Sequence, residues 1–242
     1  MSVPTPALFA LVALTAGLAR GFSGFGAALI FMPPASALVG PQLAATTLAL
    51  VDIVLAAPMI PRALPKVSLP AIAVMLAGAA VTVPVGAWLL KSLDPMTLRW
   101  MIAGIATVML GLLASGWRYR GTPHPLADLA VGAASGLFSG VAQIGGPPVV
   151  AYWLGGQGDH TEARAKIIVF FAGSSLISLA TYLVSGLIGR DTLWWALVMG
   201  PAYGLGLFAG ARLFWLADER SFRRASLLLI ALAVVTSLPV WR

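Results

Sequence analysis

Most of the residues in this chain that could do chemistry lie in or beside two glycine-rich stretches. The first reads GLARGFSGFGA over residues 17–27, and the second reads GLFSGVAQIGGPP over residues 136–148. Glycine lets a backbone approach a ligand closely and adopt conformations that other residues avoid. A break in a helix leaves backbone N–H groups without partners, and the start of the next helix carries partial positive charge. The two stretches therefore predict either helix breaks that line an anion site or, as the simpler alternative, close packing of helices through small residues.

Two polar side chains in these stretches each have two interpretations. The amide of Gln143 could donate to an anion, or it could make an interhelical hydrogen bond that serves only packing. The hydroxyl of Ser23 could face the site or bond back to its own helix. Together with their glycine-rich neighbours they give the candidate substrate-binding residues: Arg20, Ser23, Gly24, Phe25, Gly26, Gln143, Ile144, Gly145, Gly146 and Pro147.

Two charged residues fall inside apolar segments. Arg20 would be costly within a membrane and therefore functional, unless it reaches the surface or binds the carbonyl groups at the end of its helix. Asp52 stands alone in TTLALVDIVLAAP, residues 46–58. A buried carboxyl group could exchange a proton during transport, which makes Asp52 the proton-coupling candidate. It could instead simply pair with an arginine such as Arg20.

Other chemistries have little support in the residues. The chain has no cysteine, only the two histidines His124 and His160, and no cluster of acidic residues at metal-ligand spacing. No base is placed to activate a serine. We therefore expect a protein that is not an enzyme, with no metal site and no cofactor.

The composition is that of an integral membrane protein. Of the 242 residues 60% are hydrophobic and only 10% are charged, whereas a soluble domain is nearer a quarter charged. The net charge of +7 lies in short clusters between apolar segments, which favours membrane anchoring over nucleic-acid binding. The apolar segments span residues 7–39, 43–60, 69–90, 97–116, 126–155, 167–188, 192–216 and 225–241. We predict an all-α membrane protein, a polytopic helical bundle of about eight segments forming a single transmembrane domain over 1–242.

The two halves of the chain resemble each other, which predicts internal repeats over 1–118 and 125–242. Residues 17–27 align with 136–146 without a gap, and GAWLLKSLDPMTLRW (86–100) aligns with GARLFWLADERSFRR (210–224). Interrupted segments at matching places in two halves are typical of secondary transporters and indicate their binding site. If the first and fifth segments turn back, the halves are inverted and most basic loops share one side, as the positive-inside rule favours.

At the level of motifs, GFSGFGAALIFMPP and SGLFSGVAQIGGPPVVAYWL resemble the paired signatures of the TauE/SafE family of membrane anion transporters. Each half in that family opens with a variant of G-x-x-G-x-G-G, followed by apolar residues and proline. Ala27 and Ala28 stand where glycines are common, and the likeness covers nearly the whole chain. The resemblance implies a secondary transporter of small sulfur-containing anions, such as sulfite or a sulfonate like sulfoacetate, usually as export.

We therefore expect a multi-pass protein of the bacterial cytoplasmic membrane that exports such an anion by alternating access. Its expected partners are the small anion, the lipid bilayer and, as a possible coupling ion, protons, and we expect no nucleic acid. The alternatives are an uptake carrier or channel for another small anion, and a membrane-embedded enzyme. The sequence does not fix the oligomeric state.

Overall fold

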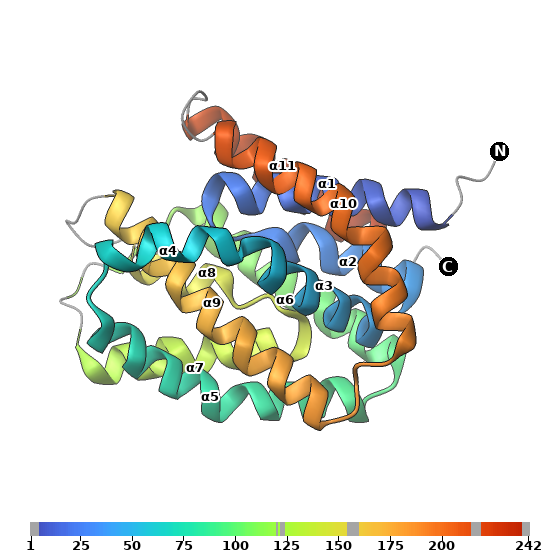
Figure 1. Ribbon diagram of the computed structural model, residues 1–242, viewed down its shortest axis with the longest axis horizontal. Helices are drawn as coiled ribbons and strands as arrows, with labels where there is room; N and C mark the ends of the chain where they lie inside the picture. Colours follow the sequence, from blue (N-terminus) through green and yellow to red (C-terminus); the bar gives the residue numbers. More distant parts are fainter. Residues whose placement is uncertain (1–4, 120, 122–123, 154–159, 214–218, 239–242) are drawn as a thin grey trace.

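A computed structural model describes residues 5–119, 121, 124–153, 160–213 and 219–238 (Figure 1). These residues form helices joined by short connections, with no β-strand among them. A membrane span takes about 20 residues, and in the described part of the chain seven helical stretches are long and apolar enough to cross. The prediction of an all-α polytopic membrane protein is confirmed.

The helices follow one another along the chain in an uneven pattern of long and short elements. They are α1 (Thr5–Ser23), α2 (Ala27–Val39), α3 (Pro41–Ala56), α4 (Ile60–Ala63), α5 (Leu69–Ser92), α6 (Pro95–Ser115), α7 (Pro125–Ala142), α8 (Gly146–Trp153), α9 (His160–Val184), α10 (Arg190–Leu213) and α11 (Glu219–Ser237). Three of the long helices start with proline, whose missing N–H is not needed in a first turn. At the start of α6, the Asp94 carboxylate accepts hydrogen bonds of 3.0 Å from the backbone N–H groups of Met96 and Thr97.

The first and fifth apolar segments are each divided into two helices. The chain leaves α1 after Ser23 and starts α2 at Ala27, and it leaves α7 after Ala142 and starts α8 at Gly146. In Figure 1, α1 runs inward from one end of the molecule and α2 returns towards that end, whereas α7 and α8 do the same from the opposite end. Both breaks thus lie inside the bundle.

Two helix pairs bring their backbones unusually close. α1 packs against α10, and α5 packs against α7. A Cβ atom built on Gly17 would lie 2.2 Å from the carbonyl oxygen of Tyr203, and one built on Gly132 would lie 1.9 Å from that of Met75. Small residues at helix contacts permit such packing inside a membrane, where dispersion contacts hold helices together. In both pairs the helix that leads into a break, α1 or α7, is thus packed closely against a long helix.

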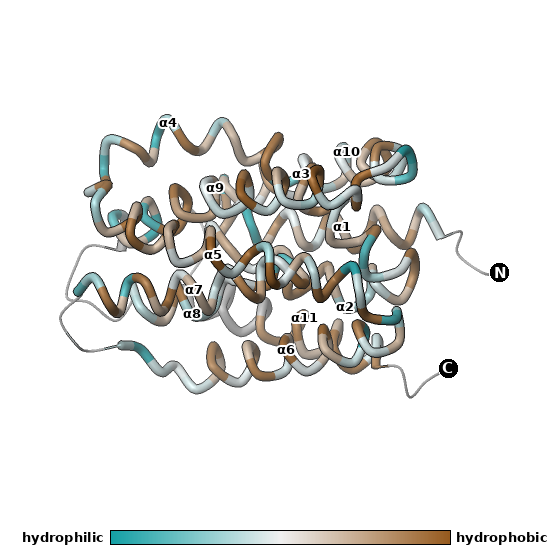
Figure 2. Tube along the Cα trace, turned by 90° about the horizontal axis from the view of Figure 1, so that it is seen from below, coloured by the Kyte–Doolittle hydropathy of each residue, from teal (hydrophilic) through white to brown (hydrophobic). Residues whose placement is uncertain are grey.

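Hydrophilic residues gather mainly at the two ends of the long axis (Figure 2). The start of α1 and the end of α11 lie at one end, together with the α2–α3 and α5–α6 junctions. The region of α4 and the starts of α5, α7 and α9 lie at the other end. The helices between are mostly apolar, as expected for segments that cross a bilayer.

Candidate functional site

The two helix breaks line one shared cavity. The space between them measures about 500 Å³, including the part that is open to solvent. Its walls come from α1, α2, α3, α7, α8 and α9 and from both breaks. The lining residues are Arg20, Phe25, Gly26, Ala27, Ala28, Leu29, Leu48, Asp52, Ser139, Gln143, Ile144, Gly146, Pro147, Phe171, Ser174 and Ser175.

The two breaks use the same backbone geometry at their first residue. Gly24 has φ of 80° and Gln143 has φ of 58°, so both lie in the left-handed region that commonly ends a helix. The N–H of Gly24 donates to the carbonyl oxygen of Arg20, and that of Gln143 donates to the carbonyl oxygen of Ser139, each at 2.9 Å. These positions are also the ones that the sequence alignment of the two stretches pairs.

The first turns of α2 and α8 face the cavity. Ala27 and Ala28 line it from α2, with Gly26 just before them, and Gly146 and Pro147 line it from α8. Backbone N–H groups in a first helical turn have no partner within the helix, and they carry the positive end of the helix dipole. In the first turn of α8 only Gly146 and Val149 have such a group, because proline has no N–H. Two such helix starts therefore bring partial positive charge to one cavity.

Side chains donate hydrogen bonds to the carbonyl groups at the ends of α1 and α7, the helices that precede the two breaks. At the end of α7, the hydroxyl of Tyr182 donates to the carbonyl oxygen of Gly140 at 2.8 Å, and Gln143 Nε2 donates to that of Ser139 at 3.0 Å. At the end of α1, Arg164 donates to the carbonyl oxygen of Gly21 at 2.9 Å. These donors offset the partial negative charge that the ends of α1 and α7 would otherwise present.

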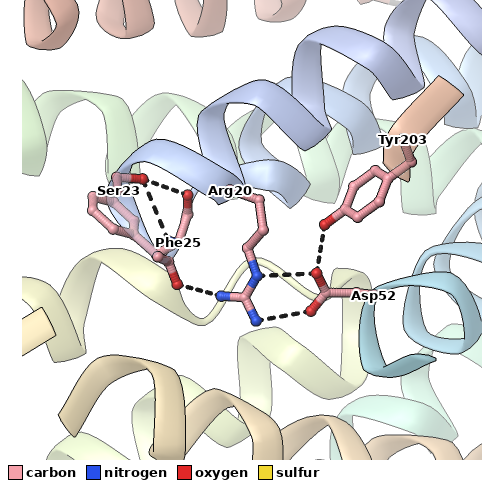
Figure 3. Close-up of polar contacts among 6 residues, drawn as sticks. Arg20, Ser23, Phe25, Asp52 and Tyr203 are labelled. Atoms are coloured by element: carbon pink, nitrogen blue, oxygen red, sulfur yellow. Dashed lines mark hydrogen bonds and ion pairs between the residues drawn. The ribbon is translucent and has the colours of Figure 1, made fainter. Parts of the chain in front are cut away.

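Arg20 is buried and makes an ion pair with Asp52. Its Nε lies 3.0 Å from Oδ1 of Asp52, and its Nη2 lies 2.9 Å from Oδ2 (Figure 3). The third guanidinium nitrogen, Nη1, donates to the carbonyl oxygen of Gly24. On the carboxylate side, the hydroxyl of Tyr203 donates to Oδ1 of Asp52. Arg20 thus binds both Asp52 and a carbonyl group at the end of its helix, the two partners that the sequence left as alternatives.

Most of the predicted site residues lie in the cavity wall, but three do not. Arg20, Phe25, Gly26, Gln143, Ile144, Gly146, Pro147 and Asp52 line it, whereas Ser23, Gly24 and Gly145 are absent from its lining. Ser23 bonds back to the carbonyl oxygen of Ala19 at 2.8 Å. The carbonyl oxygen of Gly145 accepts from the Ser135 hydroxyl at 2.8 Å. These three residues shape the breaks and do not face the space between them.

Gln143 makes the interhelical hydrogen bond and also lies in the cavity wall. Its side chain lines the cavity, and its Nε2 donates to the hydroxyl of Tyr182 on α9 at 3.2 Å. The interhelical bond fixes the amide at the edge of the space between the two breaks.

Several lining residues come from segments that gave no signal in the sequence. Phe171, Ser174 and Ser175 belong to a run of α9 that reads as ordinary apolar helix. The Arg20 guanidinium lies 5.6 Å from the ring centre of Phe171, within cation–π distance. The Ser174 hydroxyl is buried without a hydrogen-bond partner among the described residues. Only the packing of α9 against the breaks brings these side chains to the cavity.

The site offers no constellation for holding a metal ion. Within the described ranges, no three His, Asp or Glu side chains come together as ligands. What the cavity presents is a guanidinium group, hydroxyl groups, one carboxylate and two helix starts, which is a set suited to an oxyanion.

Comparison with known proteins agrees with this chemistry. Searches of curated proteins and of solved structures give no significant match. A scan against family models matches residues 9–237, nearly the whole chain, to the family described as sulfite exporter TauE/SafE. The model of that family covers both helix breaks and every residue that lines the cavity between them. The chain therefore belongs to the TauE/SafE sulfite exporter family, a family of membrane transporters and not of enzymes.

Proposed function

We propose that this protein exports a small sulfur-containing anion, sulfite or a sulfonate such as sulfoacetate, across the bacterial cytoplasmic membrane by alternating access. One observation carries the proposal, namely that two helix breaks from opposite halves of the chain line a single cavity. Membership of a sulfite exporter family supports the substrate class and the direction.

The composition of the cavity supports an oxyanion as its ligand. A sulfite or sulfonate group has three oxygen atoms that can accept hydrogen bonds from several directions at once. The first turn of α2 supplies backbone donors, the start of α8 adds the N–H of Gly146, and Ser174 supplies a side-chain donor. The rings of Phe25 and Phe171 would contact an organic tail such as that of a sulfonate.

The packing of the halves supports alternating access. α1 and α2 enter from one end of the molecule and α7 and α8 from the other (Figure 1). The first helix of each half packs on a long helix of the other half, since α1 lies on α10 and α7 lies on α5. We propose that the halves, 1–118 and 125–242, are inverted repeats. Rocking of one crossed pair against the other would expose the cavity to either side in turn.

The test is transport by the purified protein in proteoliposomes. Labelled sulfite, thiosulfate, sulfoacetate and sulfate are each supplied on one side, and saturable flux of a sulfur anion is expected. Arg20→Lys keeps the positive charge but loses the planar fork that grips a carboxylate or an oxyanion. We therefore expect this variant to lower the flux about tenfold or more. Well-folded protein that moves none of these anions would overturn the proposal.

The same vesicles separate a carrier from a channel and from an accessory subunit. A channel would give a voltage-driven current at rates that no alternating-access cycle reaches. A subunit that needs another protein would give no flux alone, yet would regain flux with its partner. Counterflow, in which unlabelled anion inside speeds the entry of labelled anion, is expected only of a carrier.

A further inference from the structure

The buried cation of the cavity already holds an anion that belongs to the protein. Nε and Nη2 of Arg20 both donate to the Asp52 carboxylate, and Nη1 donates to a backbone carbonyl (Figure 3). The side chains of Arg20 and Asp52 are only 7% and 13% exposed. An anion that enters the cavity therefore meets a guanidinium whose charge is offset by a carboxylate, not a free positive charge.

This ion pair lies in the wall between two cavities. Arg20, Asp52 and Ser175 line the cavity between the helix breaks, and the same three residues line a second, smaller cavity. The second cavity continues past Met59 and Ile60, towards the end of the molecule where α4 lies. Separation of the pair would therefore change the boundary between the two spaces.

The charged and titratable groups around Asp52 come from three helices. Arg20 on α1 and Tyr203 on α10 contact the carboxylate directly. Arg164 on α9 donates to a backbone carbonyl one residue from Arg20. The segment of α2 has no titratable side chain, and the charged residues of α5, α6 and α7 lie near the ends of those helices. Among the described residues, Asp52 is the one acidic residue in the lining of either cavity.

We propose that Asp52 is a tethered anion that the transported anion displaces from Arg20, and that the displaced carboxylate takes up a proton, so that anion and proton cross the membrane together. This inference rests on the proposed transport function and adds its coupling ion.

The exchange follows from the shapes of the groups. A guanidinium group binds a sulfonate or sulfite through two parallel hydrogen bonds, as it binds a carboxylate. The substrate can therefore replace Asp52 on Nε and Nη2 of Arg20 with little change in geometry. Arg20 remains paired in both states, which avoids the large cost of an unpaired charge inside an apolar bundle.

The proton restores the balance of charge around the displaced carboxylate. A carboxylate separated from its arginine, beside a bound anion and away from water, strongly favours its neutral form. One proton from the aqueous phase that supplies the anion forms an O–H bond on Asp52. On the opposite side the anion leaves, this O–H bond breaks, the proton goes to water, and the carboxylate returns to Arg20. One proton moves for each displacement.

The test uses anions that take up no proton themselves near neutral pH, namely thiosulfate and sulfoacetate. Proteoliposomes with a trapped pH dye receive the labelled anion, with and without a pH gradient. If one proton accompanies each anion, the gradient should change the equilibrium accumulation about tenfold per pH unit. The dye should report proton movement in the same direction as the anion. Asp52→Asn should abolish both responses, because an amide takes up no proton in this range.

Asp94→Asn is the matched control, because it makes the same chemical change outside the membrane. Hydrogen bonds from the side chain and backbone of Thr97 hold the pKa of the Asp94 carboxyl below its usual range, so it stays ionised during the assay. Asparagine caps a helix about as well as aspartate. This variant should keep the coupling of the unchanged protein.

Each outcome bears on one proposal or the other. If no sulfur anion moves, the proposed function fails. If an anion moves without following the pH gradient and without proton movement, the function stands and the coupling is overturned. If the Asp52→Asn protein binds the anion but does not transport it, a second measurement decides between the outcomes. Proton uptake is then followed while the anion binds to the protein in weakly buffered detergent solution. Binding should draw about one proton from solution in the unchanged protein and none in the variant, and proton uptake by the variant would overturn the role of Asp52.

Discussion

Ser174 shows what a single buried hydroxyl contributes to the cavity. Its side chain is 1% exposed, it lines the cavity, and its Oγ has no hydrogen-bond partner among the described residues. A serine in a helix usually bonds back to a carbonyl oxygen four residues earlier, as Ser23 does to Ala19. A buried hydroxyl left without a partner costs about 1–3 kcal/mol. This cost is offset if the hydroxyl donates to the transported anion.

Ser178 supplies the comparison, because it lies one turn further along α9. Its hydroxyl is also buried and without a partner in the described part of the chain, but it does not line the cavity. We expect Ser174→Ala to weaken apparent anion affinity about five- to tenfold, corresponding to a lost hydrogen bond of about 1 kcal/mol. Ser178→Ala should leave affinity unchanged, and both variants should melt at or above the unchanged temperature. Equal loss of affinity in both variants would remove Ser174 from the site.

Residue types alone singled out part of the cavity lining. Arg20 and Asp52 stood out because charge is costly in apolar segments, and their pairing was one of the alternatives considered. Ser174 could not be found in this way, since a serine in an apolar helix is common and its environment depends on which helix packs against it. Gln143 was chosen for its amide, but its left-handed backbone, with φ of 58°, became visible only in three dimensions.

At the scale of elements, the glycine-rich stretches predicted where the helices break, whereas prolines inside the helices did not. The breaks fall at Gly24–Gly26 and Gln143–Gly145, inside the stretches that glycine made conspicuous. Pro33 and Pro34 lie inside α2, and Pro201 lies inside α10, without ending either helix. Proline removes a donor and disturbs the preceding turn, but neighbouring helices can satisfy the freed carbonyl group in a membrane bundle. Whether a proline ends a helix therefore depended on packing partners that sequence patterns do not identify.

The glycines at helix contacts give a prediction at this scale. A Cβ on Gly132 of α7 would lie 1.9 Å from the carbonyl oxygen of Met75, whereas a Cβ on Gly104 of α6 would meet nothing within 4 Å. Gly132→Ala should therefore push α5 and α7 apart and cost about 1–3 kcal/mol. Gly104→Ala should be neutral or stabilise by about 0.5–1 kcal/mol, because alanine favours the helix. Thermal melting in detergent measures both, and equal melting temperatures would contradict the close packing.

At the scale of the whole molecule, the arrangement of the ends defines an orientation. Described basic residues at the end with α4 include Arg62, Lys66, Arg118 and Lys166, whereas the opposite end has Lys91, Arg99 and Arg190. The loops with more Lys and Arg usually stay in the cytoplasm. We propose that the end with α4 is cytoplasmic and that α1 begins and α11 ends outside the cytoplasm.

Cysteine labelling tests this orientation, and the chain contains no cysteine of its own to interfere. Ser68, beside the start of α5, and Ser92, at its end, are both exposed. In intact cells, a membrane-impermeant maleimide should label Ser92→Cys and should label Ser68→Cys only after the membrane is opened. The reverse pattern would invert the orientation, and labelling of both positions from outside would contradict the crossing of α5.

The sequence by itself determined the class of this protein, the positions of its helix breaks and its family signature. The bilayer acts as the solvent and therefore sets the apolar content and the spacing of charges along the chain. A helix break likewise needs particular residues at particular positions. Both properties are local, so they can be recognised in the sequence. Only the tertiary structure decided which groups share the cavity, that Arg20 is held by Asp52 and Tyr203, and that Ser174 faces the breaks. Those contacts join helices that are far apart in the chain. They depend on how α1 packs against α10 and how α5 packs against α7, and no local sequence pattern specifies this packing.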